Sequence, residues 1–211
     1  MRDAASLNGM LDELSRRDAV LAAALARVGY PAPRVREPGF ATLLRVIVAQ
    51  QLSTKAAAAI WGRLEAAAGG EVTPERFLAL ADAELRGCGF SGPKVAYGRG
   101  LAAAVASGEL PLAGLAAMDE DAAVAALTRV KGFGRWSAEV YLLFALCRPD
   151  VFPADDLALQ AGCQRLAGLP ERPKAVLLRE LTEPWRPYRG AGAIFLWHYY
   201  GTATLDEAKG G

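Results

Sequence analysis

The stretch RVKGFGRWSAEVYLLFALCRPDVFPADDLALQ, residues 129–160, decides the fold. It joins a turn containing two glycines, a nearly all-apolar segment and two adjacent aspartates. Glycine adopts positive φ without steric cost, so VKGFG at 130–134 can turn tightly with its amide N–H groups exposed. Such a turn, followed by the positive end of a helix, suits an anion such as a DNA phosphate. An ordinary turn between two helices explains the same letters, so this motif alone leaves both interpretations open.

The aspartate pair at the end of the stretch is more specific. Asp155 and Asp156 stand just ahead of a helical pattern, where the helix dipole favours a carboxylate. One aspartate is enough to cap the helix, and Asp155 is expected to act as that cap or as a brace. Asp156 is then left for another purpose.

Composition limits the class of protein. The 211 residues are 53% hydrophobic and 22% charged, which is typical of a globular chain that buries its own core. The net charge of +1 excludes the strongly basic footprint of many nucleic-acid-binding proteins, although local basic patches stay possible.

The cysteines and apolar runs exclude further classes. Cys88, Cys147 and Cys163 are widely spaced without a C-x-x-C pair, so we expect core cysteines and not a disulfide framework or a metal site. Apolar runs are far shorter than the roughly 20 residues of a membrane span. The first residues lack the apolar core of a signal peptide, so we expect a cytoplasmic protein with no membrane association.

Helical periodicity without alternating runs predicts an all-α fold of nine or ten helices. The expected helices cover 6–28, 40–49, 54–68, a short one from Pro74, one ending near 107, one from 119 or 121 to 129, then 140–146, 157–166, 173–181 and 192–200, before a frayed tail at 201–211.

Four ordered motifs carry a resemblance to a known family. They are IVAQQLSTKAA at 47–57, GFSGPKVAYGRGLA at 89–102, the turn with FPADD described above, and PWRPYRGAGAIFLWHY at 184–199. Together they resemble the helix-hairpin-helix DNA glycosylases, most closely the 3-methyladenine DNA glycosylase II branch. The resemblance implies a single domain of two helical lobes with a cleft between them, about 1–39 plus 150–211 and about 40–149.

The resemblance also implies an activity. Asp156 corresponds to the family's working aspartate, which stabilises positive charge on the sugar. Trp136 stands where bifunctional members carry the lysine that attacks the sugar, 156 minus 136 or 20 residues before the aspartate. We therefore expect a monofunctional glycosylase that flips out and excises alkylated purines of the 3-methyladenine and 7-methylguanine type in base excision repair.

Other site residues follow from the same resemblance. Trp136, Trp197 and Tyr141 are expected to line the base pocket, where a cationic alkylated base gains a cation–π interaction, although core packing explains aromatic residues equally well. Gln51 and Leu52 are candidates for filling the vacated stack, against an ordinary surface and core role. The expected DNA contacts are Gln50, Gln51, Leu52, Ser53, Lys131, Gly132, Phe133, Gly134 and Arg135.

No cofactor and no iron–sulfur cluster are expected. The hairpin carbonyls of Thr128, Val130 and Phe133 correspond to a monovalent cation site that bridges to a phosphate. The expected partner is double-stranded DNA with alkylated bases, bound by a monomer in the bacterial nucleoid. The sole histidine, His198, is expected to be packed or exposed and not catalytic.

Three alternatives explain part of the sequence. A non-catalytic helix-hairpin-helix DNA-binding module explains the hairpin but not the aspartate pair. A bifunctional or mismatch glycosylase shares the fold but needs the missing lysine or cysteine cluster. A helical scaffold without a nucleic-acid role explains only the composition.

Overall fold

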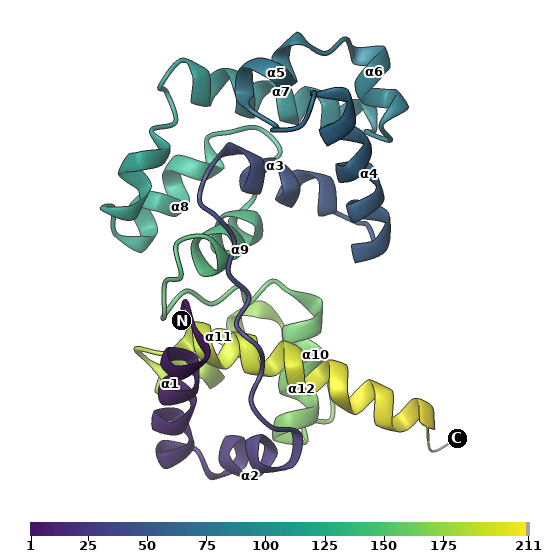
Figure 1. Cartoon of the computed structure of the whole chain (residues 1–211). Coiled ribbons are helices and arrows are strands. Elements are labelled where there is room, and N and C mark those ends of the chain that lie inside the picture. The colour runs from purple at the N-terminus through teal and green to yellow at the C-terminus, as the bar shows by residue number, and fades with distance from the viewer. Residues whose placement is uncertain (210–211) are drawn as a thin grey trace. The chain divides into compact units, whose positions relative to one another are not determined.

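The computed structural model describes the backbone of residues 1–209 and the side chains of residues 1–202. Within this part of the chain the regular elements are the helices α1 to α12 and two short 3₁₀ helices, η1 and η2, with no strand (Figure 1). The all-α prediction is confirmed. No helix in the described range is both long and apolar enough to cross a membrane.

The chain divides into two compact units. Unit 1 combines Met1–Val35 with the chain from Leu142 onward, and unit 2 is the continuous segment Arg36–Tyr141. The expected divisions were at 39 and 149. The second division falls earlier, inside α9, because the last turn of that helix packs in unit 1, where Phe144 lies against Trp197.

Unit 1 contains six elements. They are α1 (Ala4–Arg17), α2 (Ala19–Val28), α10 (Leu157–Ala167), α11 (Ala175–Thr182), η2 (Glu183–Trp185) and α12 (Arg189–Lys209). Helix α10 packs along α12, as Figure 1 shows. Gly162 permits this close approach, since a Cβ atom there would lie 2.9 Å from the carbonyl oxygen of Leu196.

The single helix expected at 6–28 is wrong, because Asp18 interrupts it. Its carboxylate accepts hydrogen bonds from the amides of Val20 and Leu21 and so caps α2, while its own amide donates to Leu14 and ends α1. The other carboxylate oxygen accepts a 2.8 Å hydrogen bond from the indole of Trp185. Asp18 therefore forms the junction between α1 and α2 and connects this junction to η2 through a hydrogen bond.

Unit 2 contains seven complete elements and most of an eighth. They are α3 (Phe40–Ala49), α4 (Thr54–Ala67), α5 (Pro74–Ala79), α6 (Asp82–Gly87), α7 (Gly92–Ala106), η1 (Leu112–Ala116), α8 (Glu120–Thr128) and α9 (Arg135–Phe144). Helix α7 packs against both α3 and α5. At Gly98 a Cβ atom would lie 2.7 Å from the Phe77 ring, so the small residue brings α7 onto the aromatic core.

Three further expectations about helices need correction. Helix α9 covers Arg135–Phe144, so the helix expected at 140–146 begins five residues earlier and ends two residues earlier. Helix α6 was not predicted, because its N-cap is Ala81 and its cap comes instead from Glu84, whose carboxylate accepts the Ala81 amide at 2.7 Å. Helix α12 continues to Lys209, so the predicted frayed tail is wrong as far as that residue, and 210–211 lie outside the described residues.

The cysteines lie apart as free thiols. Cys88 and Cys163 are buried, as expected for core cysteines, whereas Cys147 is half-buried. Burial raises the pKa of Cys163 to about 11.

Candidate active site and nucleic-acid interface

Asp156 is held at the amino end of α10 by three converging donors. Its Oδ1 atom accepts hydrogen bonds from the amides of Ala158 at 2.9 Å and Leu159 at 3.0 Å. The indole Nε1 of Trp197 donates to the same oxygen at 3.0 Å. Two backbone donors and one side-chain donor thus fix the orientation of a half-buried carboxylate.

The cap of α10 is a different aspartate from the one expected. Asp156, and not Asp155, is the N-cap of α10, so the expected cap assignment is wrong. Asp155 is exposed and forms an ion pair with Arg179 at 3.0 Å, which agrees with the alternative expectation that it braces the loop. The helix accepts one cap only, and the residue directly before Leu157 occupies that position.

Trp197 reaches Asp156 from the facing helix α12. Its ring is half-buried and lies 5.4 Å from the Phe144 ring, centroid to centroid. The next residue, His198, places its Nε2 atom 3.1 Å from the carbonyl oxygen of Val28. The histidine is therefore a packing contact between α12 and the end of α2, and Trp197 is the residue that reaches the carboxylate.

The turn between α8 and α9 uses the positive φ that was expected of its glycines at Gly132 but not at Gly134. Gly132 has φ of 88°, and the amide of Phe133 donates to the carbonyl of Val130 at 3.0 Å. A Cβ atom at Gly132 would lie 2.2 Å from Cγ of Tyr97, so only glycine fits between this turn and α7. Val130 and Phe133 are buried and anchor the turn, while Lys131 and Gly134 are exposed.

A second exposed turn connects α3 and α4. Gln51 has φ of 57°, in the left-handed region that few non-glycine residues adopt. Gln51 and Leu52 are both exposed, Leu52 by 40%. Ser53 caps α4 by accepting the Ala56 amide at 3.2 Å. The two predicted wedge residues therefore lie together on an exposed turn.

Gln50 connects the two turns. Its side-chain amide donates to the carbonyl of Gly132 at 2.9 Å and lies 3.3 Å from the hydroxyl of Ser137. The half-buried side chain of Gln50 is thus directed at the hairpin. The structure gives it a bridging contact that the sequence did not predict.

The basic residues of the hairpin are held differently. The guanidinium of Arg135 donates from Nε to Glu139 at 2.8 Å, and this hydrogen bond is the main reason that the pKa of Arg135 is raised. Lys131 is exposed on the turn itself. The ion pair with Glu139 keeps Arg135 charged at neutral pH.

The other predicted base-pocket residues belong to unit 2. Trp136 lies half-buried in the first turn of α9. Tyr141 is buried, and its hydroxyl accepts a hydrogen bond from the Gly39 amide at 3.1 Å. Burial raises the pKa of the Tyr141 hydroxyl. Asp156 and Trp197 belong to unit 1, so the predicted site residues come from both units.

The cation site expected at the hairpin uses backbone oxygens. Of the three predicted ligands, the carbonyl of Val130 already accepts the Phe133 amide. The side chain of Thr128 donates back to the carbonyl of Val124 at 2.8 Å. Among the described residues, no group of three or more His, Cys, Asp or Glu side chains could hold a metal ion.

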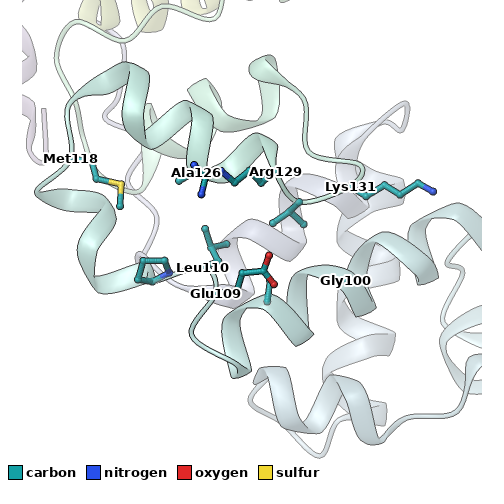
Figure 2. A pocket seen from close by; sticks show the side chains of 10 residues that line it. Gly100, Glu109, Leu110, Met118, Ala126, Arg129 and Lys131 are labelled. Carbon is teal, nitrogen blue, oxygen red and sulfur yellow. The ribbon is translucent and has the colours of Figure 1, made fainter.

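A pocket of about 310 Å³ opens in unit 2 next to the hairpin (Figure 2). Glu109 and Arg129 supply opposite charges to its wall, and the side chain of Lys131 extends away from the other labelled residues. None of Trp136, Trp197 and Tyr141 lines it. This pocket is therefore distinct from the base pocket that the sequence predicts.

Sequence reasoning missed two residues on α7 that support the turns. Lys94 donates to the carbonyls of Val48 at 2.7 Å and Gln50 at 2.8 Å, and Tyr97 packs on Gly132. Both lie in the motif at 89–102, which was used only for the family resemblance and in which no residue was assigned a role. A lysine in the first turn of a helix, where the dipole disfavours a cation, was the available signal.

The chain is similar in sequence to a family of known proteins. Residues 44–187 match the HhH-GPD superfamily of base excision DNA repair proteins. The DNA-3-methyladenine glycosylase 1 of Schizosaccharomyces pombe is 36% identical over 165 residues, which are 77% of this chain and 72% of that protein.

Two solved structures are similar over most of the chain. A 3-methyladenine DNA glycosylase of Schizosaccharomyces pombe in complex with abasic DNA superposes with a TM-score of 0.84 at 32% identity, covering 93% of this chain and 97% of the other. A DNA-3-methyladenine glycosidase of Bacillus halodurans gives 0.83 at 32% identity, covering 93% and 91%. The chain therefore belongs to the HhH-GPD superfamily of base excision DNA repair proteins.

Proposed function

We propose that this chain is a monofunctional DNA glycosylase that excises alkylated purines of the 3-methyladenine and 7-methylguanine type from double-stranded DNA. The observation that carries the proposal is the Asp156 carboxylate, whose Oδ1 is fixed by two amides and an indole. The named relatives, which are 3-methyladenine glycosylases at 36% and 32% identity, support the class of substrate.

The carboxylate acts on charge that develops during bond breaking. As the N-glycosidic bond lengthens, the deoxyribose becomes positively charged, and a preorganised anion stabilises that state more than the ground state. The donors that hold Asp156 spare the cost of orienting the group at the moment of reaction. An alkylated purine carries its own positive charge and leaves readily, so a carboxylate and a water molecule suffice.

The absence of a nucleophilic amine sets the type of reaction. Trp136 occupies the position where bifunctional relatives have lysine, and an indole cannot form a Schiff base with the sugar. The product is therefore a free base and an intact strand with an abasic site. Trp136, Trp197 and Tyr141 are proposed to form the aromatic wall of the base pocket, which favours a cationic base by about 0.5 to 2 kcal/mol.

Access to the bond requires eversion of the nucleotide, at a cost of about a few kcal/mol. Gln51 and Leu52 are proposed to fill the space left in the stack, which their exposure on a tight turn favours. The hairpin at 130–134 is proposed to bind a phosphate through its amides and Lys131. A monovalent cation on the carbonyls of Thr128, Val130 and Phe133 would add charge at the same phosphate. The protein is proposed to act as a monomer without another cofactor.

The test is an excision assay on a duplex with one 7-methylguanine. Chromatography detects the released base, and gel electrophoresis with and without hot alkali detects strand breaks. We expect base release at substoichiometric enzyme with breaks only after alkali. Breaks without alkali would show a lyase, and tight DNA binding without base release would show the non-catalytic module.

A further inference from the structure

The ammonium group of Lys94 contacts the backbone where α3 ends and the wedge turn, defined as residues 50–53, begins. Lys94 Nζ donates to the carbonyl of Val48 at 2.7 Å and to that of Gln50 at 2.8 Å. These oxygens lie at the carboxyl end of α3, where carbonyls lose their helical partners and the dipole is negative. A half-buried cation at this place satisfies two acceptors at once.

The position of Lys94 on its own helix is unfavourable. It lies in the first turn of α7, two residues after Gly92, where the helix dipole opposes a positive charge. Burial also lowers the pKa of its ammonium. A lysine that tolerates both costs must gain more from its contact with the end of α3 than a surface lysine would.

A second connection joins the wedge turn to the hairpin. The side chain of Gln50 donates to the carbonyl of Gly132 at 2.9 Å, and Tyr97, one turn after Lys94, packs on the same glycine. One face of α7 therefore supports both exposed turns. Gln50 takes part twice, with its carbonyl on Lys94 and its amide on the hairpin.

We infer that Lys94 is a positioning residue. Together with Gln50 it holds the wedge turn in a fixed position relative to the phosphate-binding hairpin, so that phosphate binding and base eversion are coupled. The inference rests on the proposed function and on the assignment of Gln51 and Leu52 as the wedge. Lys94 acts without touching DNA. Its effect on excision passes through the turn that it supports.

The experiment compares two substrates that differ only in the cost of eversion. One duplex pairs 7-methylguanine with cytosine, and the other places it opposite a stable abasic analogue, where unstacking is easier. For Lys94→Met we expect single-turnover excision of the paired lesion to fall about tenfold to a hundredfold, as for loss of charged hydrogen bonds. The loss of rate on the unpaired lesion should be smaller than the loss on the paired lesion by a factor of about five or more, because less wedge insertion is needed.

The conservative variant and the control separate positioning from general damage. Lys94→Arg keeps a cation with several donors and should recover part of the lost rate. Lys174→Met, at an exposed lysine preceding α11, should leave both rates unchanged. Equal losses of Lys94→Met on the two substrates, or no loss on either, would overturn the inference.

Two further measurements cover the remaining cases. If Lys94→Met does not fold by circular dichroism, Gln50→Met cuts the connection from the other side, and an unchanged substrate ratio there would reject the inference. Insertion of the turn is also measured without chemistry, by the fluorescence of 2-aminopurine opposite an abasic analogue. If the wild type excises no base, the proposed function fails, but the fluorescence measurement still tests the role of Lys94. An equal fluorescence signal in wild type and Lys94→Met rejects the positioning role.

Discussion

Asp156 in unit 1 and the hairpin at 130–134 in unit 2 are built by opposite means. Around Asp156, backbone amides and an indole hold one side chain, and the proposed function uses the charge of that side chain. At the hairpin, side chains such as Tyr97 and Gln50 hold a stretch of backbone, and the proposed function uses the amides of that backbone. The Asp156 region should therefore lose its function when the carboxylate itself is changed. The hairpin should lose its function when the side chains that hold its backbone are changed.

The largest expected effect concerns the charge of Asp156. Asn is as good an N-cap as Asp, so Asp156→Asn should keep α10 and the fold while removing the negative charge. We expect single-turnover excision to fall at least about a hundredfold to a thousandfold, with binding to abasic-site DNA retained. Asp155→Asn, which breaks only an exposed ion pair with Arg179, is the matched control and should stay within about twofold. Normal turnover by Asp156→Asn would remove the basis of the comparison.

The next effect tests the backbone character of the hairpin. Gly132→Ala places a Cβ atom 2.2 Å from the Tyr97 ring in a residue with φ of 88°. The left-handed conformation alone costs about 1–2 kcal/mol, so chemical denaturation should show at least that loss in unfolding free energy. Gly134→Ala is the control for stability, because no atom lies within 4 Å of its Cβ position. Equal unfolding free energies would show that the turn can relax away from α7.

A smaller effect sharpens the description of the Asp156 region. Trp197→Phe keeps an aromatic ring against Phe144 but removes the indole donor to Oδ1. We expect kcat to fall about tenfold, as for the loss of one hydrogen bond to a charged group, with little change in KM. Stopped-flow or quenched-flow excision on methylated duplex measures it. A change in KM alone would instead assign Trp197 to base binding without a part in orienting the carboxylate.

The smallest effect concerns a side chain on the hairpin. Lys131 is exposed on the turn, and removal of one phosphate contact should lower the slope of log affinity against log salt by about 1. Fluorescence anisotropy with abasic-site DNA from low to moderate salt measures this for Lys131→Met. Lys174→Met should leave the slope unchanged. A slope that does not differ between wild type and Lys131→Met would show that the hairpin binds through backbone alone.

The bounds of helices were predicted best where a residue type that commonly caps or ends a helix stands at the boundary. Helix α3 was placed with its observed bounds, and of the two starts considered for α8, at 119 or 121, Asp119 is the observed cap. The break at Asp18 was missed because an aspartate within a polar helix face and an aspartate that caps a new helix look alike in sequence. Helix α6 was missed because Glu84 supplies its cap from inside the helix.

The candidate site was predictable only where residues are close along the chain. The aspartate pair and the glycine turn are local motifs, and both are structured as expected apart from which aspartate caps. The contact of Trp197 with Asp156 joins α12 to α10, and the contacts of Lys94 and Gln50 join segments more than 40 residues apart. Such pairings depend on how helices pack, so no spacing in the sequence reveals them.

The division of the chain has a consequence for its synthesis on the ribosome. Unit 2 is one continuous segment and can fold as soon as it emerges, whereas unit 1 joins Met1–Val35 to the chain beyond Leu142. Until then the first two helices lack partners such as Trp185 for Asp18. Asp156 likewise meets Trp197 only after α12 has been made, so a nascent chain would form the turns of unit 2 well before the Asp156 carboxylate is set in place.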